Sequence, residues 1–327
     1  MAMNFQDKVL NFKISPNDNR DFTVDKVSSS SLQLNVDLSP YCTSVKDQGN
    51  IGSCTAYAGI SMFEYNRRKH FKDLNKDINQ DIFSEIFTYY TTRVNIANDK
   101  PEDDNGAYIR DTLKSLILYG SCLEKTWSSN KLFFETPSQE AYNEGKKYQA
   151  LTYLNIPVGN SSNERKTTLN TLRGLLQNGY LFIGGFRCYS NLNSGRNGII
   201  PLPSGSIIGG HAVCFVGYDD TKQVFKFKNS WSKDWGDNGY GYLPYSYLLS
   251  GDLLDLWTIM TQEENDSEIG IVKPKTSKEI MDSTIAKGLV SISLNETPVI
   301  PSSGITSRQR LSLLSFFNRV MLMKRQI

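Results

Sequence analysis

The sequence predicts an α+β protein with a helical first half and a second half made mainly of antiparallel sheet. Between about residues 50 and 148, apolar side chains recur at helical spacing. From about 149 to 261, alternating or continuous apolar runs typical of strands take over. Composition changes again at both ends of the chain. We therefore expect a leader over 1–35, a folded domain over 36–261 and a C-terminal extension over 262–327.

Four helices are predicted from the spacing of their apolar residues, over about 53–69, 79–94, 107–119 and 164–178. Gly52 and Ser53 provide a start signal for the first, which places Cys54 at a helix N-terminus. Gly120 and Gly179 end the third and fourth helices. The stretch between the third helix and residue 148 is predicted as loops.

Five strands are expected in the second half of the chain, over about 148–158, 180–189, 211–218, 224–227 and 239–247. An Asp219-Asp220 turn joins the third strand to the fourth. This turn predicts that the two strands are antiparallel neighbours in the sheet.

Composition excludes several classes of function. The 327 residues include 36 Lys and Arg against 34 Asp and Glu, a net charge of +2, so binding to a nucleic-acid backbone is not expected. The five cysteines form no C-x-x-C pair and there are only two histidines, so we expect neither a structural zinc site nor a cofactor.

The chain shows no sign of export or of a membrane span. It contains no run of 18 apolar residues, and its first residues lack the apolar region of a signal peptide. We expect a reducing, cytoplasmic location, or the host cytoplasm or virion if the source is a virus.

Cys54 is the cysteine placed for nucleophilic catalysis, because a helix N-terminus stabilises a thiolate. His70 lies 16 residues further along the same predicted helix, about 24 Å away at 1.5 Å per residue, so it cannot serve as the base. His211 remains, at the start of an apolar strand. The other cysteines are expected to be inert core residues; they are Cys42, Cys122, Cys188 and Cys214.

Two amide side chains complete the constellation. Gln48 precedes Cys54 by six residues and supplies a donor for an oxyanion, as does the backbone N–H of Cys54. Asn229 lies 18 residues beyond His211, across the Asp-Asp turn, and is placed to orient its ring. Trp231 is expected to cover the bond between them and lower the local dielectric.

These segments resemble the Gln, Cys, His and Asn motifs of papain-family cysteine peptidases, in the same order. The resemblance covers about 36–261 and rests on 47–54, 104–107, 210–213, and 229–231 with Trp235-Gly236. Residues 36–42 and 120–122 further resemble a subgroup found in bacteria and large DNA viruses.

The resemblance implies a two-lobed papain-like fold, with the active-site cleft between a helical lobe (about 50–148) and a β-rich lobe (about 149–261). It implies Cys54 as nucleophile, His211 as general base and then acid, Asn229 as orienting residue and Gln48 as oxyanion donor. Supporting and substrate-binding roles fall on Gly106, Ala107, Gly210, Trp231 and Trp235. The implied reaction is hydrolysis of peptide bonds in polypeptide substrates through a thioester, from a thiolate–imidazolium pair formed before substrate arrives.

Three departures from the family pattern bear on this prediction. Ile51 stands where secreted members carry a disulfide cysteine, and Thr55 replaces the Trp that commonly follows the nucleophile. The leader is shorter than the family's helical prosegment. A bridge between Cys42 and Cys122 stays open as an alternative.

Other interpretations also stay open. A thioester resolved by an amine gives a transglutaminase-like or ligase-like acyl transferase, and a catalytically silent binding module is a third hypothesis. The leader is either a short pro-segment lying in the cleft or a segment packed on the outside. Residues 311–323, apolar and flanked by basic residues, predict an amphipathic end that docks on the domain or on an anionic surface.

Overall fold

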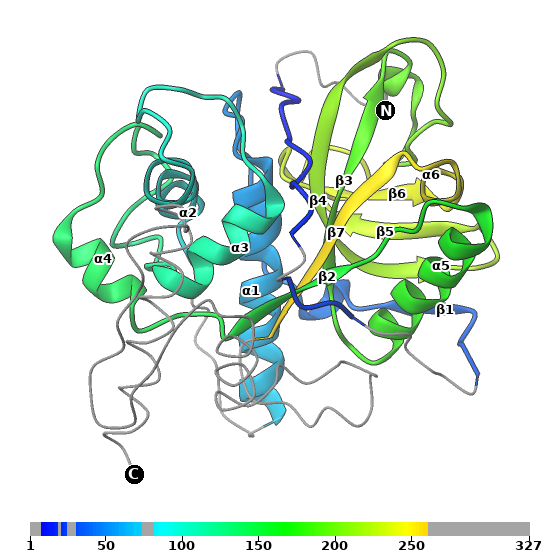
Figure 1. Cartoon of the computed structure of the whole chain (residues 1–327), viewed down its shortest axis with the longest axis horizontal. Helices are drawn as coiled ribbons and strands as arrows, with labels where there is room; N and C mark the ends of the chain where they lie inside the picture. The colour runs from blue at the N-terminus through cyan, green and yellow to red at the C-terminus, as the bar shows by residue number, and fades with distance from the viewer. Residues whose placement is uncertain (1–7, 19–20, 25–30, 74–81, 261–327) are drawn as a thin grey trace, which may run out of the picture. The chain divides into compact units, whose positions relative to one another are not determined.

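The structure is a computed structural model that describes residues 8–18, 21–24, 31–73 and 82–260 (Figure 1). The chain divides into two units, Met1–Val272 and Lys273–Ile327. The predicted C-terminal extension and its amphipathic end lie outside the described residues. Within the described ranges we find no helix with the length and hydrophobicity of a membrane span.

The first half of the folded unit is helical, as predicted. Its elements are η1 (Ser39–Tyr41), α1 (Cys54–Asp73), α2 (Glu85–Tyr90), the short π-helix η2 (Thr91–Ala97), α3 (Ile109–Leu118) and α4 (Gln139–Gly145). Figure 1 shows α2, α3 and α4 together on one side of the long helix α1. Helix α1 therefore separates this helical lobe from the sheet.

The second half forms an antiparallel sheet of seven strands in the order β2-β7-β3-β4-β5-β6, with β1 paired to β4. The strands are β1 (Asn35–Asp37), β2 (Thr152–Ile156), β3 (Phe182–Tyr189), β4 (Ile207–Asp219), β5 (Val224–Lys228), β6 (Tyr240–Pro244) and β7 (Leu253–Met260). Helices α5 (Ser162–Gln177) and α6 (Ser246–Ser250) and the 3-10 turn η3 (Leu192–Ser194) complete this lobe. The expected α+β architecture, a helical lobe followed by a lobe of antiparallel sheet, is confirmed.

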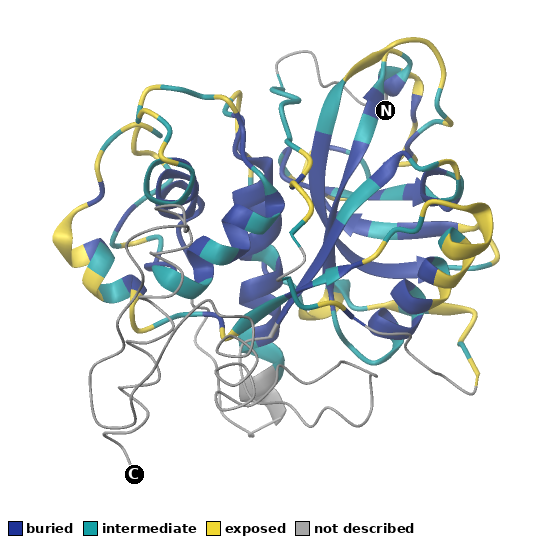
Figure 2. Cartoon of the chain, viewed as in Figure 1, coloured by how far each residue is buried: buried dark blue, intermediate teal, exposed yellow. Residues whose placement is uncertain are grey.

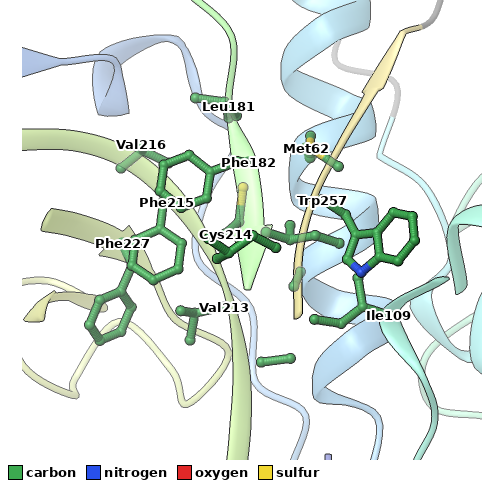
Figure 3. Packing of buried hydrophobic residues seen from close by; sticks show 14 of the residues in the cluster. Met62, Ile109, Leu181, Phe182, Val213, Cys214, Phe215, Val216, Phe227 and Trp257 are labelled. Atoms are coloured by element: carbon green, nitrogen blue, oxygen red, sulfur yellow. The ribbon is translucent and has the colours of Figure 1, made fainter. Parts of the chain in front are cut away.

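The main hydrophobic core lies between α1 and the sheet. Figure 2 shows buried residues concentrated on α1 and along the central strands. Met62 of α1 and Trp257 of β7 belong to the same buried cluster as the aromatic residues of β3 and β4 (Figure 3). In that cluster, Phe182 and Phe215 are stacked with ring centroids 4.6 Å apart. This core fixes α1, and with it Cys54, against the face of β4.

The sequence-based predictions agree with the structure for α1, α3, α5 and the first four expected strands, which are β2, β3, β4 and β5. The strand expected over 239–247 is β6 only as far as Pro244, because α6 begins at Ser246, and strands β1 and β7 were not predicted. Two further differences concern helices. The helix expected over 79–94 begins only at Glu85, because Phe83 forms a β-bridge with Leu123 and the Ser84 side chain caps the helix. Helix α4 lies in a stretch predicted as loops; it is seven residues long and begins at a Ser138 cap.

The described part of the leader is extended and packs between the two lobes. Figure 1 shows its dark-blue trace running between α1 and β4. Lys13 donates its backbone N–H to Ala107 of the helical lobe at 3.1 Å, and Phe12 donates to Gly210 of β4 at 3.3 Å. Further along, Val24 is buried and its N–H bonds Asn155 of β2 at 2.8 Å.

The stacked phenylalanine pair gives a direct test of the core. We expect Phe215→Ala to lower the free energy of unfolding by about 3–5 kcal/mol, because it leaves a cavity in a fully buried cluster. Leu202→Ala, at a side chain that is 62% exposed, is the control and should change it by less than about 0.5 kcal/mol. Urea unfolding followed by tryptophan fluorescence measures both; equal effects would contradict the proposed core.

Candidate active site

Cys54 is the first residue of α1 and is fully buried. The backbone N–H groups of Ala56 and Tyr57 donate to the carbonyl of Ser53, which starts the helix there. Burial raises the pKa of the Cys54 thiol to about 11, while the backbone N–H groups of Ala212, Thr55 and Cys54 itself act in the opposite direction. The sulfur therefore lies beside the residue that follows His211.

His211 is fully buried on β4, and its Nε2 lies 2.7 Å from Oδ1 of Asn229. The N–H of Ser230 also donates to this Oδ1, at 2.9 Å, which identifies the atom as an acceptor. Nε2 must then carry the proton, so in a neutral ring Nδ1 is the unprotonated nitrogen. Nδ1 has no hydrogen-bond partner among the described residues. The ring is thus held in the tautomer that accepts a proton at Nδ1.

The register of β4 against β5 brings Asn229 to His211. Cys214 pairs with Lys228, the last residue of β5, so Asn229 follows at the end of the strand that runs beside His211. Trp231 stacks on the imidazole with ring centroids 4.4 Å apart and planes at 26°. Burial lowers the pKa of His211 to about 4; the bond to Asn229 opposes this shift and the charge of Lys8 adds to it.

Gln48 is buried and joins the Asn229 segment to the loop before Cys54. Its backbone N–H donates to the carbonyl of Ser230 at 2.9 Å, and its Oε1 accepts from the Ser230 hydroxyl at 2.5 Å. Its Nε2 donates one hydrogen to the carbonyl of Ile51 at 2.7 Å. An amide nitrogen carries two hydrogens, so the second remains for another acceptor.

The remaining predicted site residues fall into two groups. Trp235 packs edge-to-face on Trp231, with centroids 5.3 Å apart, and so supports the ring that covers His211. Gly106, Ala107 and Gly210 lie where the leader passes. Ala107 and Gly210 each accept a backbone N–H from the leader, and Gly210 also donates to the carbonyl of Leu10 at 3.1 Å.

Glycines allow the leader to approach this closely. Gly106 adopts a φ of +69°, and a Cβ there would clash with the carbonyl of Asn11. A Cβ on Gly185 would enter the ring of Phe12. The side chain of Asn11 lies against Gly52 and donates to the carbonyl of Asp104 at 2.9 Å. The leader therefore packs against the glycines that surround Cys54 and His211.

Sequence reasoning missed the leader residues at the site, namely Leu10, Asn11, Phe12 and Lys13, and also Ala212, Ser230 and Asp104. Asp104, Ala212 and Ser230 stood inside segments already singled out, but nothing in those motifs indicated a role for them. The alternative bridge between Cys42 and Cys122 is absent, since both are free thiols and the Cys42 sulfur donates to the carbonyl of Leu38 at 3.7 Å. The described ranges hold no cluster of side chains suited to a metal ion.

Comparison with known proteins identifies the family. A family model described as papain family cysteine protease matches residues 133–247. An uncharacterised peptidase C1-like protein of Acanthamoeba polyphaga mimivirus is 33% identical over 248 residues, which cover 72% of this chain and 75% of the viral protein. The chain belongs to the papain family of cysteine peptidases. It is accordingly a hydrolase of the thiol-protease class.

Two further relatives agree with this assignment to the papain family. Xylellain, a cysteine protease from Xylella fastidiosa, superposes with a TM-score of 0.68 at 32% identity, covering 78% of this chain and 98% of xylellain. The cathepsin B-like CP2 of Giardia intestinalis is 28% identical over 210 residues, 62% of this chain and 64% of its own length.

The burial of His211 predicts an acidic titration. With two histidines in the chain, proton NMR of the imidazole Cε1–H resolves both, and His211→Gln assigns them. We expect the His211 midpoint near pH 4, because the buried ring disfavours the charged form. A midpoint near the ordinary value of about 6.5 would show that the ring is open to water.

Proposed function

We propose that this papain-family chain hydrolyses peptide bonds with Cys54 as nucleophile and His211 as general base and acid. The observation that carries the proposal is the hydrogen bond between His211 and Asn229. This bond leaves Nδ1 of His211 as the basic nitrogen. Ala212, the residue that follows His211 on the same strand, contacts the Cys54 sulfur through its backbone N–H. A base with a free lone pair, on a strand that contacts a thiol at a helix N-terminus, supports thiolate catalysis as the function.

The residues divide the steps between them. Nδ1 of His211 takes the thiol proton, and Cys54 attacks the carbonyl carbon to form a tetrahedral oxyanion. The backbone N–H of Cys54 and the second hydrogen of Gln48 Nε2 are the donors proposed for that oxyanion. The imidazolium then gives its proton to the leaving amine, and water hydrolyses the thioester. Asn229 keeps the ring oriented throughout.

Single substitutions separate these roles. We expect Cys54→Ala to abolish hydrolysis of casein and of a peptide library read by mass spectrometry, because no other group can form the thioester. Gln48→Ala should lower kcat by about 10²- to 10³-fold through loss of one oxyanion donor. Ser250→Ala is the control and should leave the rate unchanged, because Ser250 is an exposed residue of α6 whose hydroxyl bonds Asp252 and Tyr247 and none of the site residues. Turnover by purified Cys54→Ala would refute the assignment.

We also propose that the leader inhibits the enzyme in cis. Its backbone is bonded to Ala107 on one side and to Gly210 on the other, so a polypeptide substrate cannot use these groups while it is in place. The Lys8 ammonium forms an ion pair with Asp47 at 2.6 Å, and the Ser15 hydroxyl donates to Asp255 of β7 at 2.8 Å. These contacts anchor the leader on both sides of the site.

Protonation is linked to this docking. With the leader in place the pKa of His211 is about 4, whereas a ring returned to water titrates near 6.5. Between these values the open form binds a proton that the covered form does not, so acid favours opening. The pKa of Cys54 is raised from 9.0 to about 11, so the open form loses that proton first as the pH rises above 9. The leader should hold most tightly between about pH 6.5 and 9.

Phe12→Ser tests the leader. Loss of the ring that packs over Gly185 and Gly210 should raise the initial hydrolysis rate at pH 7.5 by about tenfold, because docking loses part of its apolar burial. The gain over the unmodified chain should be smaller at pH 5 than at pH 7.5, because protonation of His211 in the open form already weakens docking of the leader there. Ile14→Ser, at a leader residue that is 53% exposed, is the matched control. Equal rates for all three proteins, with intact mass verified, would remove the inhibitory role.

A reducing, cytoplasmic location is part of the proposal, in the host if the source is viral. All five cysteines are free thiols, the state that a reducing compartment maintains.

A further inference from the structure

We propose that Asp104 is a positioning residue whose carboxylate fixes the loop carrying the nucleophile against the loop that binds the peptide backbone. The nucleophile loop is residues 48–53, and the glycine loop is residues 98–107. The inference deepens the proposed function and rests on Cys54 being the nucleophile.

The carboxylate of Asp104 joins the two loops. The backbone N–H of Gly52 lies 3.1 Å from Oδ1 and 3.0 Å from Oδ2 of Asp104. Gly52 is buried and lies two residues before Cys54, outside the helix, so this N–H has no helical acceptor. Hydrogen bonds to an ionised acceptor are short and strong, and a buried N–H without one carries the full cost of desolvation. Asp104 thus determines where the chain enters α1.

The same residue determines the position of the glycine loop. Asp104 precedes Gly106 and Ala107, and the Ala107 carbonyl accepts the backbone N–H of Lys13. The carbonyl of Asp104 itself accepts from the Asn11 side chain. The carboxylate of Asp104 therefore connects the position of a peptide backbone bound at Ala107 with the position of Cys54.

Two buried side chains of the helical lobe, Tyr89 and Arg93, hold the glycine loop in place. The hydroxyl of Tyr89 donates to Asp104 Oδ1 at 2.5 Å. Arg93 donates to the carbonyls of Asp103 at 2.5 Å and Phe133 at 3.0 Å, and its guanidinium lies 4.3 Å from the Tyr89 ring centroid. Tyr89 and Arg93 are fully buried in α2 and η2. The carboxylate is thus fixed to the helical lobe rather than carried on a free loop.

The charge of Asp104 does not activate Cys54, so we infer that the contact between Asp104 and Gly52 acts by positioning the loop. The negative charge of Asp104 opposes ionisation of Cys54 and contributes, after burial and the backbone donors, to the pKa of that thiol. A carboxylate here works against thiolate formation, so activation of the sulfur does not explain it. Asn at this position keeps an acceptor for Gly52 and removes the charge, which separates the two effects.

The test compares variants in the Phe12→Ser background, so that the leader does not mask the site. Two readouts are measured: kcat/KM for peptide hydrolysis, and the rate at which iodoacetamide alkylates Cys54 as a function of pH, followed by mass spectrometry of its peptide. Asp104→Ala should lower kcat/KM by about 10- to 100-fold. Asp104→Asn should recover most of this loss and move the acid limb of alkylation to lower pH. Asp103→Ala is the matched control, because Arg93 binds its backbone carbonyl, and it should behave as the parent.

Two results would overturn the inference: Asp104→Ala matching the parent in kcat/KM, or Asp104→Asn losing as much as Asp104→Ala. If Asp104→Ala does not fold, Asp104→Asn and Tyr89→Phe test the inference in its place. Tyr89→Phe is expected to lower kcat/KM several-fold. A parent that fails to hydrolyse peptides, or a Cys54→Ala protein that succeeds, refutes the proposed function instead. The alkylation profile still reports on Asp104 in that case, so the two failures are distinguishable.

Discussion

The site depends on an antiparallel contact between two segments that come from different halves of the chain, 46–48 and 230–232. Asp47 and Trp231 form a β-bridge, Gln48 donates to the carbonyl of Ser230 at 2.9 Å, and Ser232 donates to the carbonyl of Lys46 at 3.1 Å. The first segment leads directly into the nucleophile loop, and the second follows the residue that orients His211. Because backbone pairing has a fixed register, a shift of one residue would reverse which side chains face the site. The distance between Cys54 and the histidine strand is thereby set by main-chain hydrogen bonds.

Buried charges beneath this contact hold the same segments. The ammonium of Lys46 lies 3.1 Å from Glu64 of α1 and 2.5 Å from Glu85 of α2. Lys228, the residue before Asn229, donates to the Thr43 hydroxyl at 2.9 Å, and that hydroxyl donates to Glu64. Removing one member of such a network leaves an uncompensated charge in the interior, which costs far more than the intact network contributes. The network therefore specifies one arrangement of the two segments and penalises others.

The sequence predicts local features of this molecule better than features made by distant contacts. Cys54 at a helix start follows from the Gly52-Ser53 signal, since capping is decided within a few residues. The late start of α2 cannot be predicted from local sequence, because Phe83 forms a β-bridge with Leu123, which is 40 residues away. The sequence left two positions open for the leader, in the cleft or on the outside, because its place between the lobes depends on glycines that are distant in sequence and carry no local signal. Asp104 lay inside a recognised motif, yet its partner Gly52 is 52 residues away. Spacing alone does not reveal such pairs.

Burial of Cys54 and His211, the proposed catalytic pair, links access to the site with the reactivity of the thiol. With the leader in place, the thiol of Cys54 has a pKa of about 11 and the imidazole of His211 one of about 4, so both are neutral across the physiological range. A neutral thiol beside a neutral imidazole is a poor nucleophile, because the reactive species is the thiolate. On the proposed function, the thiolate–imidazolium pair expected from the sequence forms only after the leader leaves, when water or a substrate's dipoles solvate the two charges. A segment that only blocked the site would still leave an activated sulfur beneath it. A segment that also excludes water keeps the sulfur protonated, so in the proposed inhibition the steric and the electrostatic effect both come from the apolar contacts of Phe12 over Gly185 and Gly210.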